Sequence, residues 1–250
     1  MKLTQFFREH PKAALAYSGG VDSSYLFYEA VKSGADICAY YCKTELQPEF
    51  ELRDAVRLSN DIGGRLKILH LSVLEFSDIC ENSPLRCYYC KQYIFGLIMK
   101  QALADGYDLL LDGNNASDSI TDRPGMKASG EMGVLSPLRE SGLTKKDIRA
   151  LSRDAGLFTW NKPAYSCLAT RIPTGKTISG ELLEKIERGE QALFALGFSD
   201  FRLRAKDGYA LLQLPESQLE TAANLWDTIE NKLAADFPSV RLDRNPRASD

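Results

Sequence analysis

Short apolar runs alternate with amphipathic stretches through the first part of the chain. The runs, which end at polar or glycine-rich residues and predict buried strands, lie at 13–17, 37–42, 66–73 and 107–111. The stretches with apolar residues at helical spacing lie at 22–34, 48–63, 88–105 and 144–155. Strands that alternate with helices form βαβ units. The pattern therefore predicts an α/β fold, with a parallel sheet and helices on both of its faces.

The pattern changes near residue 160, where an irregular, proline-containing stretch begins. The elements predicted beyond it are a helix, two strands, a helix and a strand, at 180–196, 201–204, 209–214, 216–235 and 239–243. The two adjacent strands flank Asp207-Gly208, a strong hairpin signal. This order predicts a small α+β unit. We expect a first domain, a bridging active-site segment and a substrate-binding or oligomerisation domain, at 1–160, 161–178 and 179–250.

Seven residues between the first strand and the first helix have the composition of a phosphate-binding loop. They are Ser18-Gly19-Gly20-Val21-Asp22-Ser23-Ser24. Such a turn presents main-chain N–H groups at the positive end of a helix dipole, its glycines permit close approach, and its serines add hydroxyl donors. Asp22 is a candidate ligand for Mg²⁺. The Walker sequence is absent, which argues against γ-phosphoryl transfer of that type. The alternative is an ordinary capped turn.

A second glycine motif, Asp112-Gly113-Asn114, follows the fourth predicted strand. Ligands of parallel sheets bind beyond the carboxyl ends of the strands, so this motif is expected to face the same site as the serine-rich loop. Residues 113–133, rich in Gly, Asn, Ser and Asp, are predicted to form a long functional or mobile loop. Asp122, Arg123 and Lys127 lie in it and could close over a substrate, although a solvated surface loop is the alternative.

The charge balance bears on the kind of partner. The 250 residues include 31 basic and 34 acidic side chains, a formal net charge of −3, and no dense run of Lys or Arg. Proteins that bind nucleic acids are usually basic over at least one face, so a small polyanionic ligand is favoured over tRNA or DNA. The apolar runs are too short to span a bilayer and the first residues lack a signal-peptide core, which predicts a cytoplasmic protein without a membrane partner.

Three of the six cysteines, Cys87, Cys90 and Cys167, are candidates for chemistry. Thiols stay reduced in the cytoplasm, so the even number does not indicate disulfides. Together the three thiolates could hold a [4Fe–4S] cluster in which one iron stays open for sulfide or substrate. A purely structural role is the alternative. Cys167 is also a candidate nucleophile or sulfur donor, because Lys162 and Arg171 near it in the sequence favour the thiolate.

The other thiols and the histidines exclude some chemistry. Cys38 and Cys42 lie four apart on a predicted strand, so they share one face and are expected in the core. Cys80 carries no signal. The two histidines, His10 and His70, are too few for a His-rich metal site and give little support to a Ser-His-Asp triad.

Five stretches together resemble the LarE family of ATP-dependent sulfur transferases, a branch of the PP-loop ATP pyrophosphatase superfamily that serves nickel-pincer cofactor biosynthesis. The stretches lie at 16–24, 86–91, 111–114, 122–128 and 166–175. The resemblance runs over nearly the whole chain. It implies that ATP adenylates a carboxylate of pyridinium-3,5-biscarboxylic acid mononucleotide, and that a sulfur nucleophile then displaces AMP to give a thiocarboxylate, with both carboxylates treated in turn.

The resemblance also implies roles for individual residues. Catalysis is implied for Cys167 and Asp22. The residues implied in ATP binding are Ser18, Gly19, Gly20, Asp22, Ser23, Ser24, Gly113 and Arg171. Those implied in substrate binding are Lys91, Asp122, Arg123, Arg202 and Arg204. The implied ligands of a [4Fe–4S] cluster are Cys87, Cys90 and Cys167, the sulfur being carried as a cluster-bound sulfide or given up by Cys167 itself.

The second predicted domain holds further candidates. Arg202 and Arg204 lie two apart on a strand, so they share a face and could clamp the phosphate of a mononucleotide. Glu190, Glu216 and Asp243 could form an acidic metal site at a contact between subunits of a homo-oligomer. Acids on helix faces are usually just solvated, which is the alternative for this group.

Other functions fit parts of the sequence. Enzymes of tRNA thiolation also use a PP-loop, and some have three cluster cysteines, but they are expected to show zinc-binding cysteine pairs or a basic RNA-binding face. Amidating ligases share the loop and do not need the three cysteines. A non-catalytic nucleotide-binding or metal-sensing module would bind ATP without releasing AMP and pyrophosphate.

Overall fold

The computed structural model describes residues 2–118 and 124–247, which form two compact units. The first unit comprises Met1–Ser72 and Leu85–Lys162. The second comprises Val73–Pro84 and Pro163–Asp250. A short segment from the first half of the chain therefore belongs to the second unit, because its contacts are made with the C-terminal residues.

The first unit is built on a four-stranded parallel sheet with the order β3-β2-β1-β4. Its strands are β1 (Lys12–Ala16), β2 (Asp36–Lys43), β3 (Arg65–His70) and β4 (Leu110–Leu111). Each strand is reached from the previous one through a helix, as βαβ units require. The predicted α/β class and parallel sheet are confirmed.

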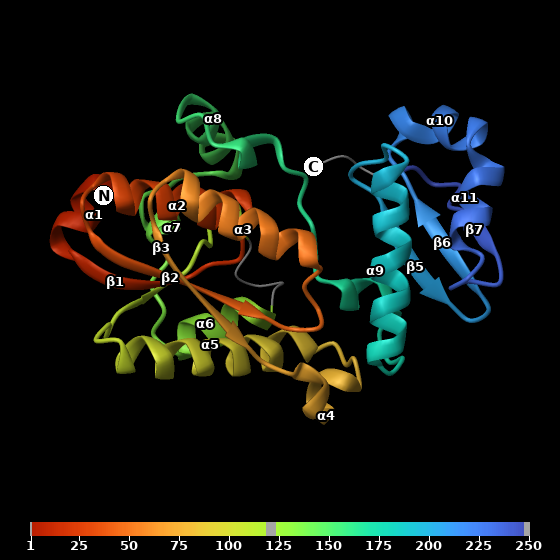
Figure 1. Ribbon diagram of the computed structural model, residues 1–250. Helices are drawn as coiled ribbons and strands as arrows, with labels where there is room; N and C mark the ends of the chain where they lie inside the picture. Colours follow the sequence, from red (N-terminus) through yellow and green to blue (C-terminus); the bar gives the residue numbers. More distant parts are fainter. Residues whose placement is uncertain (1, 119–123, 248–250) are drawn as a thin grey trace. The chain divides into compact units, whose positions relative to one another are not determined.

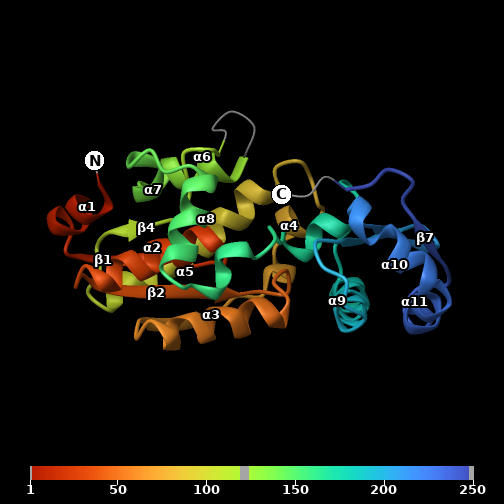
Figure 2. The same cartoon turned by 90° about the horizontal axis from the view of Figure 1, so that it is seen from above.

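Helices cover both faces of this sheet. They are α1 (Leu3–Glu9), α2 (Val21–Lys32), α3 (Glu49–Asp61), α5 (Arg86–Ala104), α6 (Pro124–Glu131), α7 (Pro137–Glu140), α8 (Lys145–Asp154) and the 3₁₀ turn η2 (Phe158–Asn161). Figures 1 and 2 show α2 and α3 on one face and α5 on the other. Successive strand residues alternate between the two cores: Tyr41 belongs to the core that contains Leu26 of α2, whereas Tyr40 belongs to the core that contains Phe95 of α5.

Two sequence expectations for this unit can be judged. Cys38 and Cys42 both belong to the core on the α5 side, as their spacing predicts. The prediction of an unbroken loop at 113–133 is wrong, because α6 lies inside it. Two glycines make this segment a weak helix former, but Ala128 is fully buried and the helix packs along α5, so tertiary contacts outweigh propensity.

The second unit contains a three-stranded sheet of order β5-β6-β7. Its strands are β5 (Arg202–Lys206), β6 (Tyr209–Gln213) and β7 (Val240–Leu242), with β5 antiparallel and β7 parallel to β6. Its helices and 3₁₀ turns are η1 (Val73–Glu75), α4 (Ser77–Cys80), η3 (Leu168–Arg171), α9 (Gly180–Ala195), η4 (Glu216–Gln218), α10 (Leu219–Asn224) and α11 (Trp226–Leu233). The predicted hairpin and α+β character are confirmed.

Two details of this unit are not predicted by its pattern of apolar residues. The single helix predicted at 216–235 is interrupted at Leu225, yet the buried residues Ala222, Ile229 and Leu233 keep helical spacing across the break, so the apolar pattern alone does not reveal it. Helix α9 lies close against β5 because Gly189 has no side chain: a Cβ there would come within 2.4 Å of Leu203 Cδ2. Among the described residues, every helix is too short or too polar to cross a membrane.

Candidate nucleotide and thiol sites

The serine-rich loop joins β1 to α2 in the first unit. Gly19 has φ +75°, a conformation that favours glycine, and a Cβ on it would come within 3.3 Å of the main-chain oxygen of Glu51. Gly20 precedes α2 with extended backbone angles, so the helix begins at Val21. The main-chain N–H groups of the first turn have no acceptors within the helix, which makes this end of α2 suited to an anion.

The hydroxyl groups of the loop are held in a connected set. Ser18 Oγ lies 3.0 Å from Ser23 Oγ, and Ser23 Oγ donates to the main-chain oxygen of Gly20 at 3.3 Å. Ser24 Oγ lies 3.3 Å from the hydroxyl of Tyr17, whose pKa is raised by burial, so the phenol stays neutral. The loop is therefore ordered by its own side chains before any ligand binds.

Asp22 has one carboxylate oxygen engaged and one without a partner. Its Oδ2 accepts a hydrogen bond from Lys145 Nζ at 2.6 Å, whereas its Oδ1 is buried and has no hydrogen-bond partner among the described residues. A buried, unpartnered carboxylate oxygen is costly unless a donor or a cation binds it. An oxygen beside a phosphate-binding turn fits the donor set that Mg²⁺ prefers.

The glycine motif after β4 packs directly on the loop. A Cβ on Gly113 would lie 2.8 Å from the main-chain nitrogen of Ser23, so only glycine allows this approach. The preceding residue, Asp112, is buried and accepts hydrogen bonds from Asn114 and Ser136. Lys91 of α5 reaches the same carboxylate, with its Nζ 3.8 Å from Asp112 Oδ2. The structure thus brings together the two glycine motifs that the sequence predicts to share a site, and Lys91 lies beside the second of them.

Two lysines at this site were not predicted to reach it. Lys145 begins α8 after a Thr144 capping box and pairs with Asp22, 123 residues earlier. Lys162, predicted only as a neighbour of Cys167, pairs with Glu51 and Asp54 of α3. Sequence patterns give no signal for such pairs, because each lysine lies in an ordinary polar stretch and meets its partner only through the fold.

The candidate cysteines are divided between the units. Cys87 and Cys90 lie near the start of α5, three residues apart and hence on one helix face, with Cys87 exposed and Cys90 partly buried. Cys167 is partly buried and immediately precedes η3 in the second unit. Within neither unit do three or more His, Cys, Asp or Glu side chains of the described residues form a group able to hold a metal ion.

A buried ion pair supports the segment that carries Cys167. Arg171, only 1% exposed, donates from Nε to Glu190 Oε1 at 2.8 Å and from a terminal nitrogen to Glu190 Oε2 at 3.1 Å. Its other terminal nitrogen donates to the main-chain oxygens of Ser166, at 2.6 Å, and of Cys167, at 3.3 Å. Burial opposes the charge of Arg171, but attraction to Glu190, the hydrogen bonds to it and the nearby Tyr165 and Cys167 together outweigh burial and leave the pKa of Arg171 raised. The guanidinium predicted to bind ATP is thus engaged inside the second unit.

Two further arginines reach the same segment from β5. Arg202 is buried and donates to the main-chain oxygen of Ala164 at 2.5 Å, and Arg204 donates to that of Thr170 at 2.7 Å. Burial, followed by the nearby charges of Arg171 and Arg247, lowers the pKa of Arg202 to about 10. The guanidinium groups keep their charge at neutral pH, so the segment lies in positive surroundings suited to a phosphate.

The other candidate residues are not gathered into a site. The Glu190 carboxylate accepts hydrogen bonds from Arg171, from the main-chain N–H of Leu203 and from the Tyr165 hydroxyl. Asp243 accepts from Gln213 at 2.6 Å. Glu216 lies on η4, and Lys127 on α6 forms an exposed pair with Glu131. Asp122 and Arg123 lie outside the described residues.

Replacing Arg171 by methionine is expected to lower the free energy of unfolding by about 3–5 kcal/mol, because Glu190 is then left as an uncompensated buried charge. Urea unfolding followed by circular dichroism measures the loss. Arg188→Met is the matched control, since Arg188 lies on the same helix as Glu190 and pairs with Asp236 at 2.7 Å while its own side chain stays half exposed. The control should cost less than about 1 kcal/mol. Equal losses in the two variants would contradict the stabilising role of the buried pair.

Comparison with known proteins shows what the chain is similar to. An uncharacterized protein of Synechocystis is 35% identical over 87% of this chain and 82% of its own length. The pyridinium-3,5-bisthiocarboxylic acid mononucleotide synthase of Lactiplantibacillus plantarum is 30% identical over 96% of this chain and 88% of its own length. A tRNA-specific 2-thiouridylase of Thermotoga is 23% identical over 91% of this chain and 80% of its own length. No protein-family model matches the chain.

Proposed function

The chain belongs to the family of pyridinium-3,5-bisthiocarboxylic acid mononucleotide synthases, and we propose that it uses ATP to convert the carboxylates of pyridinium-3,5-biscarboxylic acid mononucleotide to thiocarboxylates. The family relation extends over nearly the whole chain, so both units take part in the likeness. The chain is accordingly a sulfurtransferase enzyme with the PP-loop type of ATP site.

One observation within the structure carries the ATP-dependent part of this proposal. The buried Asp22 Oδ1 has no hydrogen-bond partner among the described residues and belongs to a loop whose hydroxyls and helix N–H groups are already ordered. A turn of this kind binds phosphate oxygens, and the carboxylate oxygen supplies a ligand for the Mg²⁺ that accompanies ATP. Ser18, Gly19, Gly20, Ser23 and Ser24 are the proposed pyrophosphate-binding residues.

The proposed reaction has two bond exchanges at each carboxylate. A substrate carboxylate oxygen attacks the α-phosphorus of ATP, the bond to the bridging oxygen of the β-phosphate breaks, and pyrophosphate leaves with the electron pair. A thiolate or hydrosulfide then attacks the acyl carbon, and AMP leaves as the phosphate oxygen takes up the electrons. Adenylation is needed because a carboxylate is anionic and has no good leaving group.

The second unit supplies groups for the substrate and for sulfur. Arg202 and Arg204 are the proposed ligands of the substrate phosphate, since planar guanidinium groups match phosphate oxygens. Their present acceptors are main-chain oxygens of the segment that carries Cys167. Cys167 is the proposed sulfur-bearing residue. Lys91, Asp122 and Arg123 remain proposed substrate-binding residues, and Arg171 a proposed ATP-binding residue whose guanidinium is paired in the structure described.

Cys87, Cys90 and Cys167 are the proposed ligands of a [4Fe–4S] cluster. Their chemistry fits, because iron–sulfur clusters are bound by cysteine thiolates and the two thiols on α5 share one helix face. When bound, a cluster with three protein thiolates has one iron able to hold an additional sulfide. In the alternative route, the Cys167 thiolate forms a thioester with the acyl group; a base then removes the Cα proton of Cys167 and its Cβ–S bond breaks, so that the sulfur leaves as the thiocarboxylate and Cys167 becomes dehydroalanine. A cytoplasmic location and a homo-oligomer also remain predictions.

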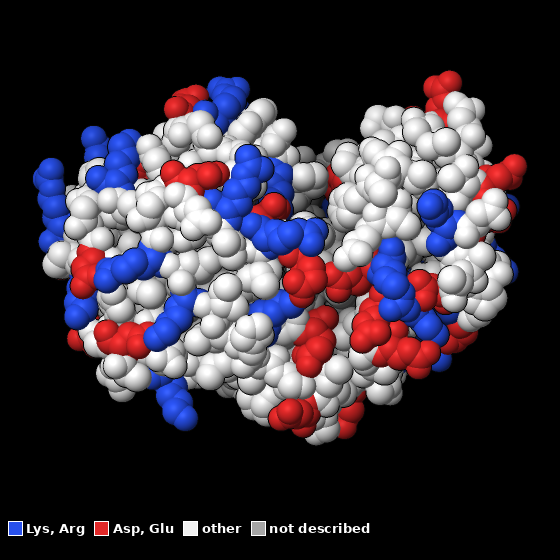
Figure 3. Space-filling view, viewed as in Figure 1, with Lys and Arg blue, Asp and Glu red and all other residues white. Residues whose placement is uncertain are grey.

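The assay that tests the proposed function supplies the protein, purified without oxygen, with Mg-ATP and the pyridinium biscarboxylate mononucleotide. AMP and pyrophosphate should form together, and mass spectrometry should show oxygen replaced by sulfur in the substrate. Iron and sulfide analysis of the same sample reports the cluster. ATP binding without AMP or pyrophosphate would instead indicate a binding module. Thiolation of added tRNA would favour the rival enzyme class. The face in Figure 3 carries both basic and acidic side chains on each unit.

A further inference from the structure

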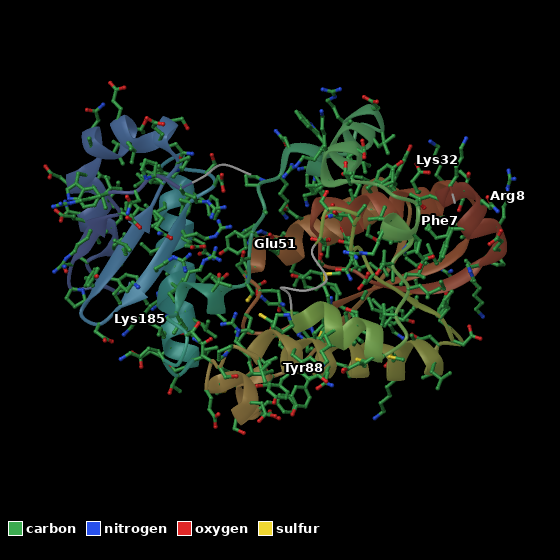
Figure 4. All side chains as sticks on the ribbon, turned by 180° about the vertical axis from the view of Figure 1, so that it is seen from behind. Phe7, Arg8, Lys32, Glu51, Tyr88 and Lys185 are labelled. Carbon is green, nitrogen blue, oxygen red and sulfur yellow. The ribbon has the colours of Figure 1, made fainter. Side chains whose placement is uncertain are left out.

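A lysine lies between two carboxylates, next to Gly19 of the phosphate-binding loop. Lys162 Nζ is 2.8 Å from Glu51 Oε2 and 2.7 Å from Asp54 Oδ2. Glu51 lies on the first turn of α3 (Figure 4), and Asp54 follows one turn later. The side chains of Lys162 and Glu51 are 14% and 9% exposed, so this pair is largely shielded from water, whereas Asp54 is 31% exposed.

This cluster touches the loop itself. Lys162 Nζ lies 3.5 Å from the main-chain oxygen of Gly19, and a Cβ on Gly19 would lie 3.5 Å from Glu51 Oε2. Glu51 is buried, which raises its pKa, while Lys162 acts in the opposite direction and favours the carboxylate. Polyphosphate bound in the loop would face two carboxylates at short range, a repulsive arrangement unless a cation stands between them.

The position of Lys162 is set from several sides. Arg149 of α8 donates to the main-chain oxygens of Trp160, at 2.8 Å, and of Lys162, at 3.0 Å. The ammonium also lies 5.5 Å from the ring centre of Phe50. An ammonium has three N–H donors, and two of them serve the carboxylates. The third is near Gly19 O at 3.5 Å, a distance too long for a strong hydrogen bond, so it can turn to a ligand oxygen.

We propose that Lys162 is a further catalytic residue of the adenylation site, whose ammonium contacts the β- or γ-phosphate oxygens of ATP and offsets the charge on departing pyrophosphate. Glu51 and Asp54 are positioning residues that hold the ammonium at the loop. This inference rests on the proposed use of ATP. In the adenylation step Lys162 keeps its proton: the α-phosphorus gains a bond to the substrate carboxylate and loses its bond to the bridging oxygen, which keeps the electron pair.

The competing explanation is that Lys162 only neutralises the two acids. Two variants separate these roles. Lys162→Met removes the cation and leaves the carboxylates beside the loop. The triple variant Lys162→Met, Glu51→Gln, Asp54→Asn removes all three charges at similar volume. If Lys162 is only a counterion, the triple variant should recover activity; if it contacts phosphate, the triple variant should fold and remain impaired.

The experiment measures pyrophosphate release and the binding of ATP and AMP by calorimetry. For the triple variant we expect release to fall about 10²-fold, in the range for removal of one preorganised donor to a developing charge. ATP affinity should fall at least tenfold while AMP affinity stays unchanged, since AMP lacks the β- and γ-phosphates. Lys32→Met, which changes an exposed lysine on α2, is the control. It should match the unsubstituted protein in pyrophosphate release, in ATP affinity and in AMP affinity.

Recovery of pyrophosphate release to within a few-fold in the triple variant would overturn the proposal, as would equal losses of ATP and AMP affinity. The binding measurements need no sulfur acceptor, so they remain decisive if the proposed substrate is wrong. In that case the unsubstituted protein releases no pyrophosphate with the pyridinium compound. The triple variant should still lose affinity for ATP and keep its affinity for AMP. Thermal unfolding by circular dichroism confirms that the triple variant is folded.

Discussion

Replacement of Cys167 by alanine is expected to abolish thiocarboxylate formation while pyrophosphate release continues. The two reactions depend on different parts of the chain in the proposed function. The loop and Asp22 that serve adenylation belong to the first unit, whereas Cys167 lies before η3 in the second. Alanine removes only the sulfur atom and its proton, so the arginines that donate to the main chain around position 167 keep their acceptors. The loss should therefore be one of chemistry rather than of folding.

Mass spectrometry of the pyridinium product and a coupled pyrophosphate assay check this expectation side by side. Cys80→Ala is the control, because Cys80 is a partly buried thiol of the same unit whose Sγ lies 3.4 Å from the main-chain oxygen of Leu74. It should leave both reactions unchanged. Thiocarboxylate formed at the normal rate by Cys167→Ala would remove Cys167 from the sulfur pathway.

A second substitution distinguishes a cluster-bound sulfide from Cys167 as the source of sulfur. If a cluster-bound sulfide is transferred, Cys87→Ser should lose both the iron–sulfur absorption and the product. If Cys167 gives up its own sulfur, Cys87→Ser should still complete one turnover, and the mass of the protein should fall by the loss of hydrogen sulfide from Cys167. The two routes thus differ in a measurement on the protein itself.

The fold follows from the sequence wherever apolar periodicity and glycine punctuation agree. The run at 13–17 ends at Ser18-Gly19-Gly20, and β1 and α2 lie where that boundary predicts. Periodicity reports which residues are buried, but not which strands are neighbours, so the order β3-β2-β1-β4 could not be read from it. It also fails for α6, whose glycines indicate a loop and whose helix depends on packing against α5.

The candidate site, like the fold, follows from the sequence only in part. The loop and Gly113 are predictable because each follows a strand of a parallel sheet, and such strands end at a common edge. The contact between Gly113 and Ser23 confirms that the two motifs lie together. Partners such as Glu51 for Lys162, or Glu190 for Arg171, arise from long-range packing and carry no local signal. The sequence thus predicts candidate residues by their recognisable chemistry, but it does not predict the partners that position them.

Asp22→Asn is expected to reduce pyrophosphate release about 10³-fold, the scale of several kcal/mol that a bound metal contributes to charge stabilisation. The amide keeps the size of the side chain but loses the negative charge, so both the proposed Mg²⁺ ligand and the partner of Lys145 are weakened. Raising the Mg²⁺ concentration should recover part of the activity, because the defect lies in metal affinity. A titration of the pyrophosphate rate against Mg²⁺ measures this shift.

A second variant separates the metal from the lysine. Lys145→Met removes the partner of Asp22 Oδ2 and leaves the carboxylate, including the buried Oδ1, in place. Its loss of pyrophosphate release should be at least tenfold smaller than that of Asp22→Asn, and its Mg²⁺ titration should stay close to that of the unsubstituted protein. Glu29→Gln, at a partly buried position of α2 where Glu29 pairs with Lys32, controls for charge on the same helix. Equal losses in the Asp22 and Lys145 variants, with no shift in Mg²⁺ dependence, would mean that the unpartnered oxygen is not a metal ligand.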